Sequence, residues 1–266
     1  MNYSFMTFST PDLSLAEALR TARRFGYDGI EPRLDSKHAH GIEVAAAPDA
    51  RAAIRRQVSE SGVALACLAT SLVFADPAAE DDMVRQAHER IDLAGDVGAP
   101  ALRVFGGRVP PGLAREAAIA QVAKCLAAVA DHAAARGVAV CLETHDDWCD
   151  PAHVAAVLER ANHPAIACNW DVMHPVRMGL ATVEQSFQTL RRWIRHTHLH
   201  DGTGGKAALK MVPIGTGEID HKTFIRLLKQ AGYTGYLSGE WINWEPWEIH
   251  LPRELATLKR YEQETP

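Results

Sequence analysis

Residues 137–145 read GVAVCLETH, and this stretch contains the pattern that decides the fold. It opens on a glycine that follows a helical repeat, continues as an apolar run, and ends on polar and charged residues. Gly137 suits the left-handed residue that closes a helix, and Val138–Glu143 suits a strand buried on both faces. The chain therefore passes here from a helix into a buried strand, and an acidic side chain, Glu143, stands where that strand ends.

The same pattern recurs along the whole chain. Before Gly137, apolar residues at steps of three and four predict a helix through residues 119–133. Other helical segments end in the same way, at Gly26, Gly62, Gly98 and Gly232. The apolar runs of strand character are Tyr3–Ser9, Gly29–Leu34, Val63–Thr70, Ala101–Phe105, Val138–Glu143, Ala165–Trp170, Ile194–Leu199 and Tyr236–Glu240.

Capping residues mark where helices begin. Each is a Ser, Thr or Asp, whose side chain can accept a hydrogen bond from an unpaired amide in the first turn of a helix. Two of them have a Glu or Gln three residues later, and one is followed by a proline. The predicted caps are Ser14 with Glu17, Thr182 with Gln185, Asp150 with Pro151, and Asp220.

Eight strands that alternate with helices in 266 residues predict a (β/α)₈ TIM barrel, with residues 1–266 forming a single domain. An open Rossmann-like sheet is the alternative. The first strand, however, is not followed by a G-x-G-x-x-G turn, and Gly106-Gly107 after the fourth strand lacks the rest of that pattern. We therefore expect the closed barrel.

Composition limits the partners and the compartment. Hydrophobic residues make up 47% and charged residues 23% of the chain, and the net charge is −5, which disfavours nucleic acid and acidic membranes as partners. No apolar run reaches the ~18 residues of a membrane span. The five cysteines form no C-x-x-C pair, which indicates a reducing, cytoplasmic environment. Cys67, Cys141 and Cys168 lie in apolar runs, where we expect them to be core residues.

Polar side chains gather at the ends of the last four strands. Glu143, Asp171 and Glu240 end three of them, and His196-x-His198-x-His200 ends the other. Because reactive groups of such barrels lie at the C-terminal strand ends, these side chains are expected to meet. Three carboxylates would repel one another, whereas a divalent cation held by them and one imidazole would resolve the repulsion. The competing interpretation is that they are separate structural groups, ion-paired to loop arginines.

An ordered set of motifs resembles the sugar phosphate isomerase/epimerase family of xylose isomerase-like TIM barrels. The motifs cover most of the chain. They are Gly26-Tyr27-Asp28-Gly29-Ile30-Glu31, Glu143-x-His145, Asp171-x-x-His174, His196-x-His198-x-x-Asp201, Gly215-x-Gly217-x-Ile219 and Gly232-Tyr233-x-Gly235 before Glu240.

The resemblance implies a site and a reaction. Its metal quartet falls on Glu143, Asp171, His198 and Glu240, with Mn²⁺ the first choice of metal and Mg²⁺, Co²⁺ and Zn²⁺ the alternatives. The two glutamates would serve as opposed acid and base around an enediolate, His174 would contact the substrate and the developing oxyanion, and His145 would also contact the substrate. The implied enzyme is a metal-dependent isomerase or epimerase of a sugar, keto-sugar or sugar phosphate.

Two departures from the family limit what can be carried over. Many relatives read His-x-Lys-Asp where this chain has His198-Leu199-His200-Asp201, so a permanent cation is replaced by a histidine that titrates near pH 6.5. The ketose 3-epimerases carry a sugar-holding arginine where this chain has residues 202–206, GTGGK. Lys206 and Lys210 are candidates for contact with an anionic substrate group, and solvated loop lysines are the alternative.

Other functions remain open from the sequence. A dehydratase of a keto-polyol or dehydroshikimate-like acid would need an added general acid, for which His145, His200 and Lys206 are candidates. AP endonuclease IV shares the barrel and much of the quartet, but Leu209-Lys210-Met211 replaces its Asp-x-His. A sugar-binding module is a further alternative. Trp241, Trp244 and Trp247 fit a packed loop, a sugar platform or a contact in a homo-oligomer.

Overall fold

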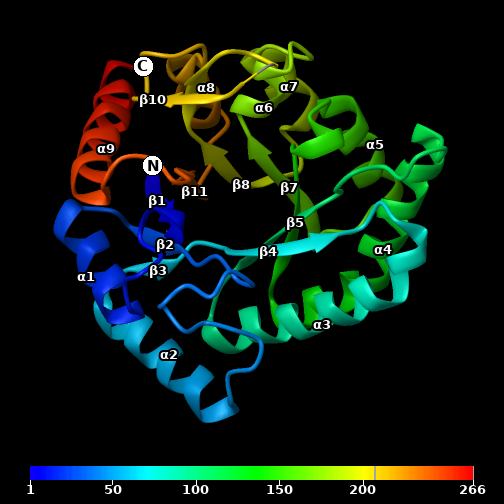
Figure 1. The fold of residues 1–266 in the computed structure, drawn as a ribbon, viewed down its shortest axis with the longest axis horizontal. Helices are drawn as coiled ribbons and strands as arrows, with labels where there is room; N and C mark the ends of the chain where they lie inside the picture. Colours follow the sequence, from blue (N-terminus) through cyan, green and yellow to red (C-terminus); the bar gives the residue numbers. More distant parts are fainter. Residues whose placement is uncertain (207, 266) are drawn as a thin grey trace.

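Parallel strands form one nearly closed barrel with helices around it (Figure 1). The structure is a computed structural model that describes residues 1–206 and 208–265. Nine strands lie side by side in the order β3-β2-β1-β11-β8-β7-β6-β5-β4, and their pairings are parallel. Their bounds are β1 Asn2–Met6, β2 Gly29–Glu31, β3 Ala64–Leu65, β4 Leu68–Val73, β5 Ala101–Phe105, β6 Ala139–Glu143, β7 Ile166–Asp171, β8 Ile194–Leu199 and β11 Tyr236–Gly239.

The helices pack around the outside of the strands, as the alternating pattern predicts (Figure 1). The TIM barrel fold is thereby confirmed, together with the four predicted helix starts, each of which makes its side-chain cap. Their bounds are α1 Leu15–Phe25, α2 Pro48–Ser61, α3 Glu80–Val97, α4 Arg115–Arg136, α5 Pro151–Ala161, α6 Met173–Arg177, α7 Val183–Leu190, α8 His221–Gln230 and α9 Trp247–Glu264.

The barrel closes through a strand that is broken in the middle. The sequence predicted one strand over Val63–Thr70, but β3 and β4 are separated by Ala66 and Cys67, and β4 continues to Val73. β3 pairs with β2, β4 pairs with β5, and a bridge between Arg33 and Ala69 spans the gap. The break lets one segment turn from one neighbour to the other, which periodicity does not reveal.

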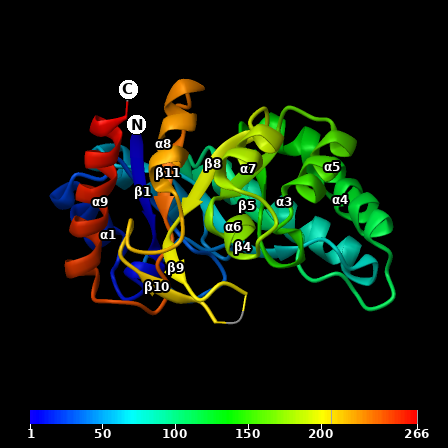
Figure 2. The same ribbon diagram turned by 90° about the horizontal axis from the view of Figure 1, so that it is seen from above.

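Two other strands are shorter than expected, and two more were missed. β1 stops at Met6 and continues as a 3₁₀ turn over Thr7–Ser9, while β2 stops before Pro32, which has no amide to donate. The loop expected after β8 contains an antiparallel pair, β9 (Asp201–Thr203) and β10 (Lys210–Val212). Figure 2 shows this pair at the end of the barrel toward which β8 runs.

A buried carboxylate explains why the predicted Gly215-x-Gly217-x-Ile219 motif accompanies Asp201. Asp201 Oδ1 accepts hydrogen bonds from the amides of Gly202 at 2.9 Å and Ile219 at 3.2 Å. Its Oδ2 accepts from Gly215 at 2.8 Å and Gly217 at 3.0 Å. A Cβ at Gly217 would collide with Asp201 Oδ1. The carboxylate therefore fixes the turn that leads into α8.

Most of the buried apolar side chains form one cluster that includes strands and helices, and Cys67, Ala101, Cys141 and Ala167 form a small second one. The expected core cysteines, Cys67, Cys141 and Cys168, are fully buried, and all five cysteines are free. Trp241 is buried, which favours the packed-loop interpretation for that residue. Within the residues that the structure describes, no helix combines the length and apolar character needed to cross a membrane.

We expect Asp201→Asn to destabilise the fold strongly. An asparagine keeps one acceptor oxygen but points an amide group at two backbone N–H donors, and each buried donor left unpaired costs about 1–3 kcal/mol. The melting temperature should fall by roughly 5–15 °C in thermal unfolding followed by circular dichroism.

Asp220→Asn is the matched control, because Asp220 caps α8 through the amide of Thr223 and asparagine is an equally good N-cap. The control variant should melt close to the wild type. Equal melting temperatures for Asp201→Asn and the wild type would contradict the structural role given to Asp201.

Candidate metal centre and substrate pocket

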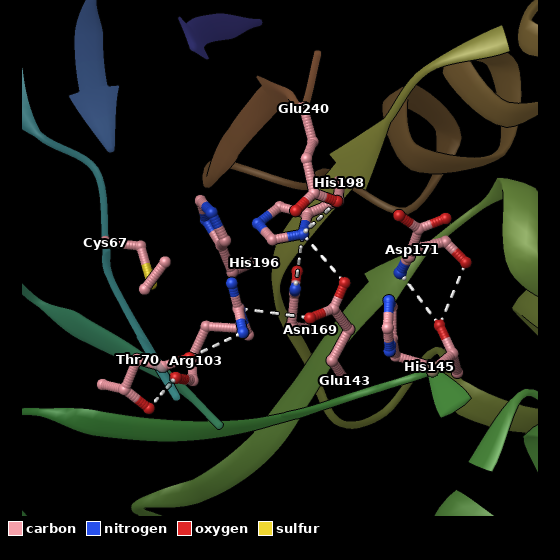
Figure 3. A network of polar contacts seen from close by, with 12 residues as sticks. Cys67, Thr70, Arg103, Glu143, His145, Asn169, Asp171, His196, His198 and Glu240 are labelled. Carbon is pink, nitrogen blue, oxygen red and sulfur yellow. Dashed lines mark hydrogen bonds and ion pairs between the residues drawn. The ribbon is translucent and has the colours of Figure 1, made fainter. Parts of the chain in front are cut away.

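Four side chains from consecutive strand ends meet at the C-terminal end of the barrel (Figure 3). Each offers a ligand atom, and these atoms all lie within 4.8 Å of one another. The side chains are buried, with Glu240 the most accessible at 5% of its surface. This set, called here the quartet, consists of Glu143, Asp171, His198 and Glu240.

The strand geometry explains the convergence of the quartet. Successive residues of a strand point to opposite faces, so inward positions recur every second residue. Glu143 and Asp171 end β6 and β7, and the register pairs Asp171 with His198 on β8. Thr144 ties the first two ends together, since its hydroxyl donates to the carbonyl of Asp171 at 3.0 Å and accepts the Asp171 amide at 2.9 Å.

Asp171 has one oxygen committed to the backbone and one directed at the site. Its Oδ1 accepts hydrogen bonds from the amides of Met173 and His174, at 2.8 and 3.2 Å, at the start of α6. Its Oδ2 makes no hydrogen bond of good geometry, although His200 Nε2 lies 3.1 Å away. A fully buried carboxylate oxygen without a hydrogen-bond donor costs free energy. A ligand that binds Oδ2 would remove this cost.

The structure distinguishes the three histidines of the β8 segment. His198 Nδ1 faces the quartet, 3.0 Å from Glu143 Oε1 and 3.5 Å from Glu240 Oε2. His196 points elsewhere, with its Nε2 2.7 Å from Glu31, and His200 faces Asp171. His196 and His200 also belong to groups of side chains close enough to hold an ion, with Glu31 and His198 and with Asp171 and His174 respectively, so His198 as the metal ligand stays a prediction.

Glu31 is a residue of this site that the sequence analysis missed. Its Oε1 lies 2.9 Å from His198 Nε2, on the side of the ring that faces away from the quartet. Its Oε2 lies 2.7 Å from His196 Nε2 and accepts a hydrogen bond from the Ser238 hydroxyl at 2.6 Å. A carboxylate on Nε2 favours the tautomer with its proton there, which leaves the Nδ1 lone pair for a metal. The signal was the repeated Gly-Tyr-x-Gly that precedes both Glu31 and Glu240.

Arg103 and Asn169 complete the surroundings of the quartet (Figure 3). Arg103 Nε lies 3.1 Å from Glu143 Oε2, its Nη1 donates to the carbonyl of Thr70 at 2.9 Å, and its side chain is 1% exposed. Asn169 Nδ2 lies 3.1 Å from His198 Nδ1. Glu143 thus has a buried arginine beside it, as the separate-groups interpretation expected, and yet it lies within the quartet.

The charges of the cluster are strongly coupled. Burial acts to raise the pKa of Glu31 and of Glu240, but His198 and the other cations outweigh it, lowering the pKa of Glu31 well below its usual range and that of Glu240 to about 2. For His198, burial acts to lower the pKa, and the carboxylates of Glu31, Glu143 and Glu240 raise it well above its ordinary value. The carboxylates of Glu31 and Glu240 therefore remain charged, and their negative charge favours a cation near them.

The quartet fits a divalent metal ion. Three carboxylates and one imidazole are a donor set for a hard or borderline cation, and Asp171 Oδ2, which has no hydrogen bond of good geometry, gives it a free oxygen. Glu31 supplies the hydrogen bond that commonly orients a metal-binding histidine from behind. The chemistry of the side chains does not by itself distinguish Mn²⁺ from Mg²⁺, Co²⁺ or Zn²⁺.

A pocket of about 840 Å³ lies beside the quartet, lined by the segments that follow β4, β5, β6, β7 and β9. The three residues predicted to contact substrate, His145, His174 and Lys206, all line it. His174 also reaches the quartet, with its Nε2 3.8 Å from Asp171 Oδ2. Lys210 lies on β10 and is not part of the lining.

The two pocket histidines have opposite charge preferences. Burial lowers the pKa of His174 to about 4, despite the opposing attraction of Asp171. Burial also acts to lower the pKa of His145, but its hydrogen bond to Asp146 and the charge of Glu143 outweigh burial and raise that pKa to about 9. At neutral pH the pocket therefore contains a neutral imidazole and a protonated one, whose ring centroids are 4.5 Å apart.

Comparison with known proteins gives a family match and several similar folds. The sequence profile of the family described as xylose isomerase-like TIM barrel matches residues 19–261. The chain is 27% identical over 236 residues to the L-ribulose-5-phosphate 3-epimerase UlaE of Salmonella paratyphi C, which covers 85% of this chain and 81% of that protein.

Two solved structures share the fold over nearly the whole chain. The probable 3-DHS dehydratase AsbF of Bacillus anthracis, involved in petrobactin synthesis, has a TM-score of 0.81 at 20% identity, covering 97% of this chain and 99% of that one. A xylose isomerase-like TIM barrel protein from Mycobacterium smegmatis, in complex with magnesium, has a TM-score of 0.76 at 18% identity, covering 100% and 98%. At these identities the likeness is one of fold.

We expect Glu31→Gln to weaken metal binding without removing a quartet residue. The amide would accept from His198 Nε2 less strongly than the carboxylate, so Nδ1 would be a poorer and less well oriented ligand. Loss of such a supporting group typically lowers metal affinity about 10–100-fold, and isothermal titration with Mn²⁺ measures it. Glu159→Gln, which changes a surface carboxylate paired with Arg192, is the control and should bind as the wild type does. Unchanged Mn²⁺ affinity in Glu31→Gln would contradict this role.

Proposed function

Because the chain belongs to the xylose isomerase-like TIM barrel family, we propose that it is a metal-dependent isomerase or epimerase of a sugar, keto-sugar or sugar phosphate. The observation that carries the proposal is the quartet itself, in which Glu143 and Glu240 both lie near Nδ1 of His198, with the pocket beside it. The similarity to an L-ribulose-5-phosphate 3-epimerase supports the same class of reaction.

Glu143, Asp171, His198 and Glu240 would hold one divalent metal ion, with Mn²⁺ the first choice. When bound, such an ion would supply Lewis acidity to a carbonyl and its neighbouring hydroxyl, which acidifies the carbon-bound proton between them and stabilises an enediolate. The magnesium complex of a protein with the same fold supports a divalent ion of this kind.

The glutamates would transfer the proton. A low pKa keeps the Glu240 carboxylate charged at neutral pH, so it can accept a proton from carbon. Glu143, anchored beside Arg103, would exchange a proton on the opposite side of the substrate. Removal on one face and return on the other inverts a centre, whereas return to the neighbouring carbon moves the carbonyl.

His174 would stabilise the oxygen on which negative charge develops. Its low pKa makes it a neutral imidazole at neutral pH, which can donate a hydrogen bond and retain its second nitrogen as an acceptor. Its position between Asp171 and the pocket supports this role. His145 and Lys206, which line the same pocket, would contact the rest of the substrate.

A dehydratase is the second candidate, and the charge state of His145 favours it. Elimination of a hydroxyl next to an enolate needs a general acid, and an imidazole with a pKa of about 9 is protonated at neutral pH. The shared fold with a probable 3-DHS dehydratase is compatible with this reaction. Both candidate reactions begin with the same proton abstraction. A dehydratase then eliminates a hydroxyl group, whereas an isomerase or epimerase returns the proton.

We expect proton exchange that depends on a divalent metal. Incubation in heavy water with Mn²⁺ and a panel of ketoses, ketose phosphates, keto-inositols and dehydroshikimate should place deuterium beside the carbonyl of the true substrate, and chelation with EDTA should abolish the exchange. An inverted centre or moved carbonyl indicates an isomerase or epimerase, and a new double bond indicates a dehydratase. Turnover of a panel member without solvent deuterium at that carbon, or turnover undiminished by EDTA, would contradict the proposal.

We expect Glu143→Gln and Glu240→Gln each to lower turnover by roughly 10²–10⁴-fold, the usual contribution of a general acid or base. The measurement is kcat at saturating substrate and excess Mn²⁺, which separates lost proton transfer from weakened metal binding. Glu159→Gln again serves as the surface control. Near-normal rates in both site variants would contradict the two-glutamate mechanism and would point to His174 or His145 as the acid and base.

A further inference from the structure

The wall of the pocket beside the quartet contains both acidic and basic side chains. The two sets differ in whether other groups of the protein already pair with them. Three acids and three bases line it, from loops that are far apart in the sequence. The acids are Asp76, Asp146 and Asp147, and the bases are Arg108, Arg177 and Lys206.

Each acid is already engaged by the protein. Asp76 accepts a hydrogen bond at 2.9 Å as the N-cap of a 3₁₀ turn. Asp146 Oδ1 lies 3.1 Å from His145 Nδ1. Asp147 Oδ2 accepts the amide of Val109 at 2.8 Å. Their negative charge is therefore directed at local backbone and side-chain donors.

The bases, in contrast, have no anionic partner. Arg177 donates from Nε to the carbonyl of Gly205 at 2.9 Å and makes no ion pair with any residue in 1–206 or 208–265. Arg108 and Lys206 make neither an ion pair nor a side-chain hydrogen bond within the same described ranges. The pocket thus presents three cations that form no ion pair within the described residues, and Asp146, whose pKa is lowered chiefly by its hydrogen bond with His145, is near enough for the charge of Arg108 to lower that pKa further.

Arg177 lies on the same short helix as His174, the pocket residue that reaches the quartet. His174 and Arg177 are three residues apart on α6, so they lie on the same face of that helix, and both line the pocket. His174 Nε2 is 3.8 Å from Asp171, whereas Arg177 is bonded to the loop that carries Lys206. A ligand that reaches from the quartet past His174 would meet Arg177 next.

The loop that carries Arg108 is restrained as well. The amide of Val109, the residue that follows it, is held by Asp147, and Pro110 and Pro111 fix the backbone beyond. Arg108 is therefore presented from a stiff loop. The exposed side chain of Arg108 is itself free of hydrogen bonds within the described residues, so it can turn toward an anion in the pocket.

We propose that this pocket binds an anionic group of the substrate, a phosphate monoester or a carboxylate, through Arg108, Arg177 and Lys206. This inference rests on the proposed function and deepens it by naming the substrate class, an acidic carbohydrate whose carbonyl lies at the quartet and whose anion lies in the pocket. Guanidinium groups match the oxygens of both anions with paired hydrogen bonds, and lysine adds a mobile charge.

The test is equilibrium binding by calorimetry to the metal-loaded protein, so that it does not depend on turnover. The probes are a ketopentose 5-phosphate, the corresponding free ketopentose and a keto-sugar acid, with inorganic phosphate and acetate as competitors. At least one acidic sugar should bind about 10–100-fold more tightly than the neutral sugar, the usual effect of a charge-assisted pair. Competition by phosphate alone identifies a phosphate site, and competition by acetate identifies a carboxylate site.

Arg177→Gln should remove most of the preference for the acidic sugar and leave the affinity for the neutral sugar unchanged. Lys206→Gln should reduce the preference, whereas Lys210→Gln, a nearby lysine outside the pocket lining, should not. Equal wild-type affinity for acidic and neutral sugars would overturn the anion site, as would equal losses for both sugars in Arg177→Gln. Failure of the proposed isomerase would appear separately, as tight anion-dependent binding without proton exchange.

Discussion

The carboxylates around His198 impose the constraint on which the rest of this end of the barrel depends. Glu31 faces Nε2, while Glu143 and Glu240 face Nδ1, and all are buried. Such a concentration of negative charge is tolerated only if each group is oriented and a cation offsets the repulsion. Arg103 supplies one permanent cation beside Glu143. Backbone amides hold one oxygen of Asp171, and Ser238 and His196 hold Glu31. A divalent ion in the quartet would complete this balance.

The barrel separates two tasks in space. Strand ends are rigid, and they hold the quartet, where the proposed proton transfer would need fixed geometry. Loops and short helices beyond the strands form the pocket, where the remainder of a substrate would be recognised. His174 lies between the two regions, and the turn fixed by Asp201 supports the segment after β8.

Local rules were sufficient to predict the repeated unit and the meeting of polar side chains at the last four strand ends, whereas the choice of His198 among three histidines came from the family resemblance. Left-handed glycines, capping boxes and apolar runs each depend on a few neighbouring residues, and parallel strands bring their ends to one side. The break at Ala66-Cys67 and the β9–β10 pair depend on contacts between distant segments, so periodicity did not reveal them. Glu31 was missed for a related reason. Its role lies in contact with His196 and His198, some 165 positions along the chain, and the Gly-Tyr-x-Gly repeat that marks Glu31 does not show which distant side chains it meets.

The most direct test of this account is the anomalous scattering of Mn²⁺ in crystals of the protein, recorded at the manganese absorption edge. We predict one strong peak per chain among Glu143, Asp171, His198 and Glu240, about 2.0–2.3 Å from a carboxylate oxygen of each acid and from Nδ1 of His198. Glu31 should remain on Nε2 of the same ring. A saturated crystal with no peak between these four side chains, or with the ion bound only elsewhere, would contradict the account.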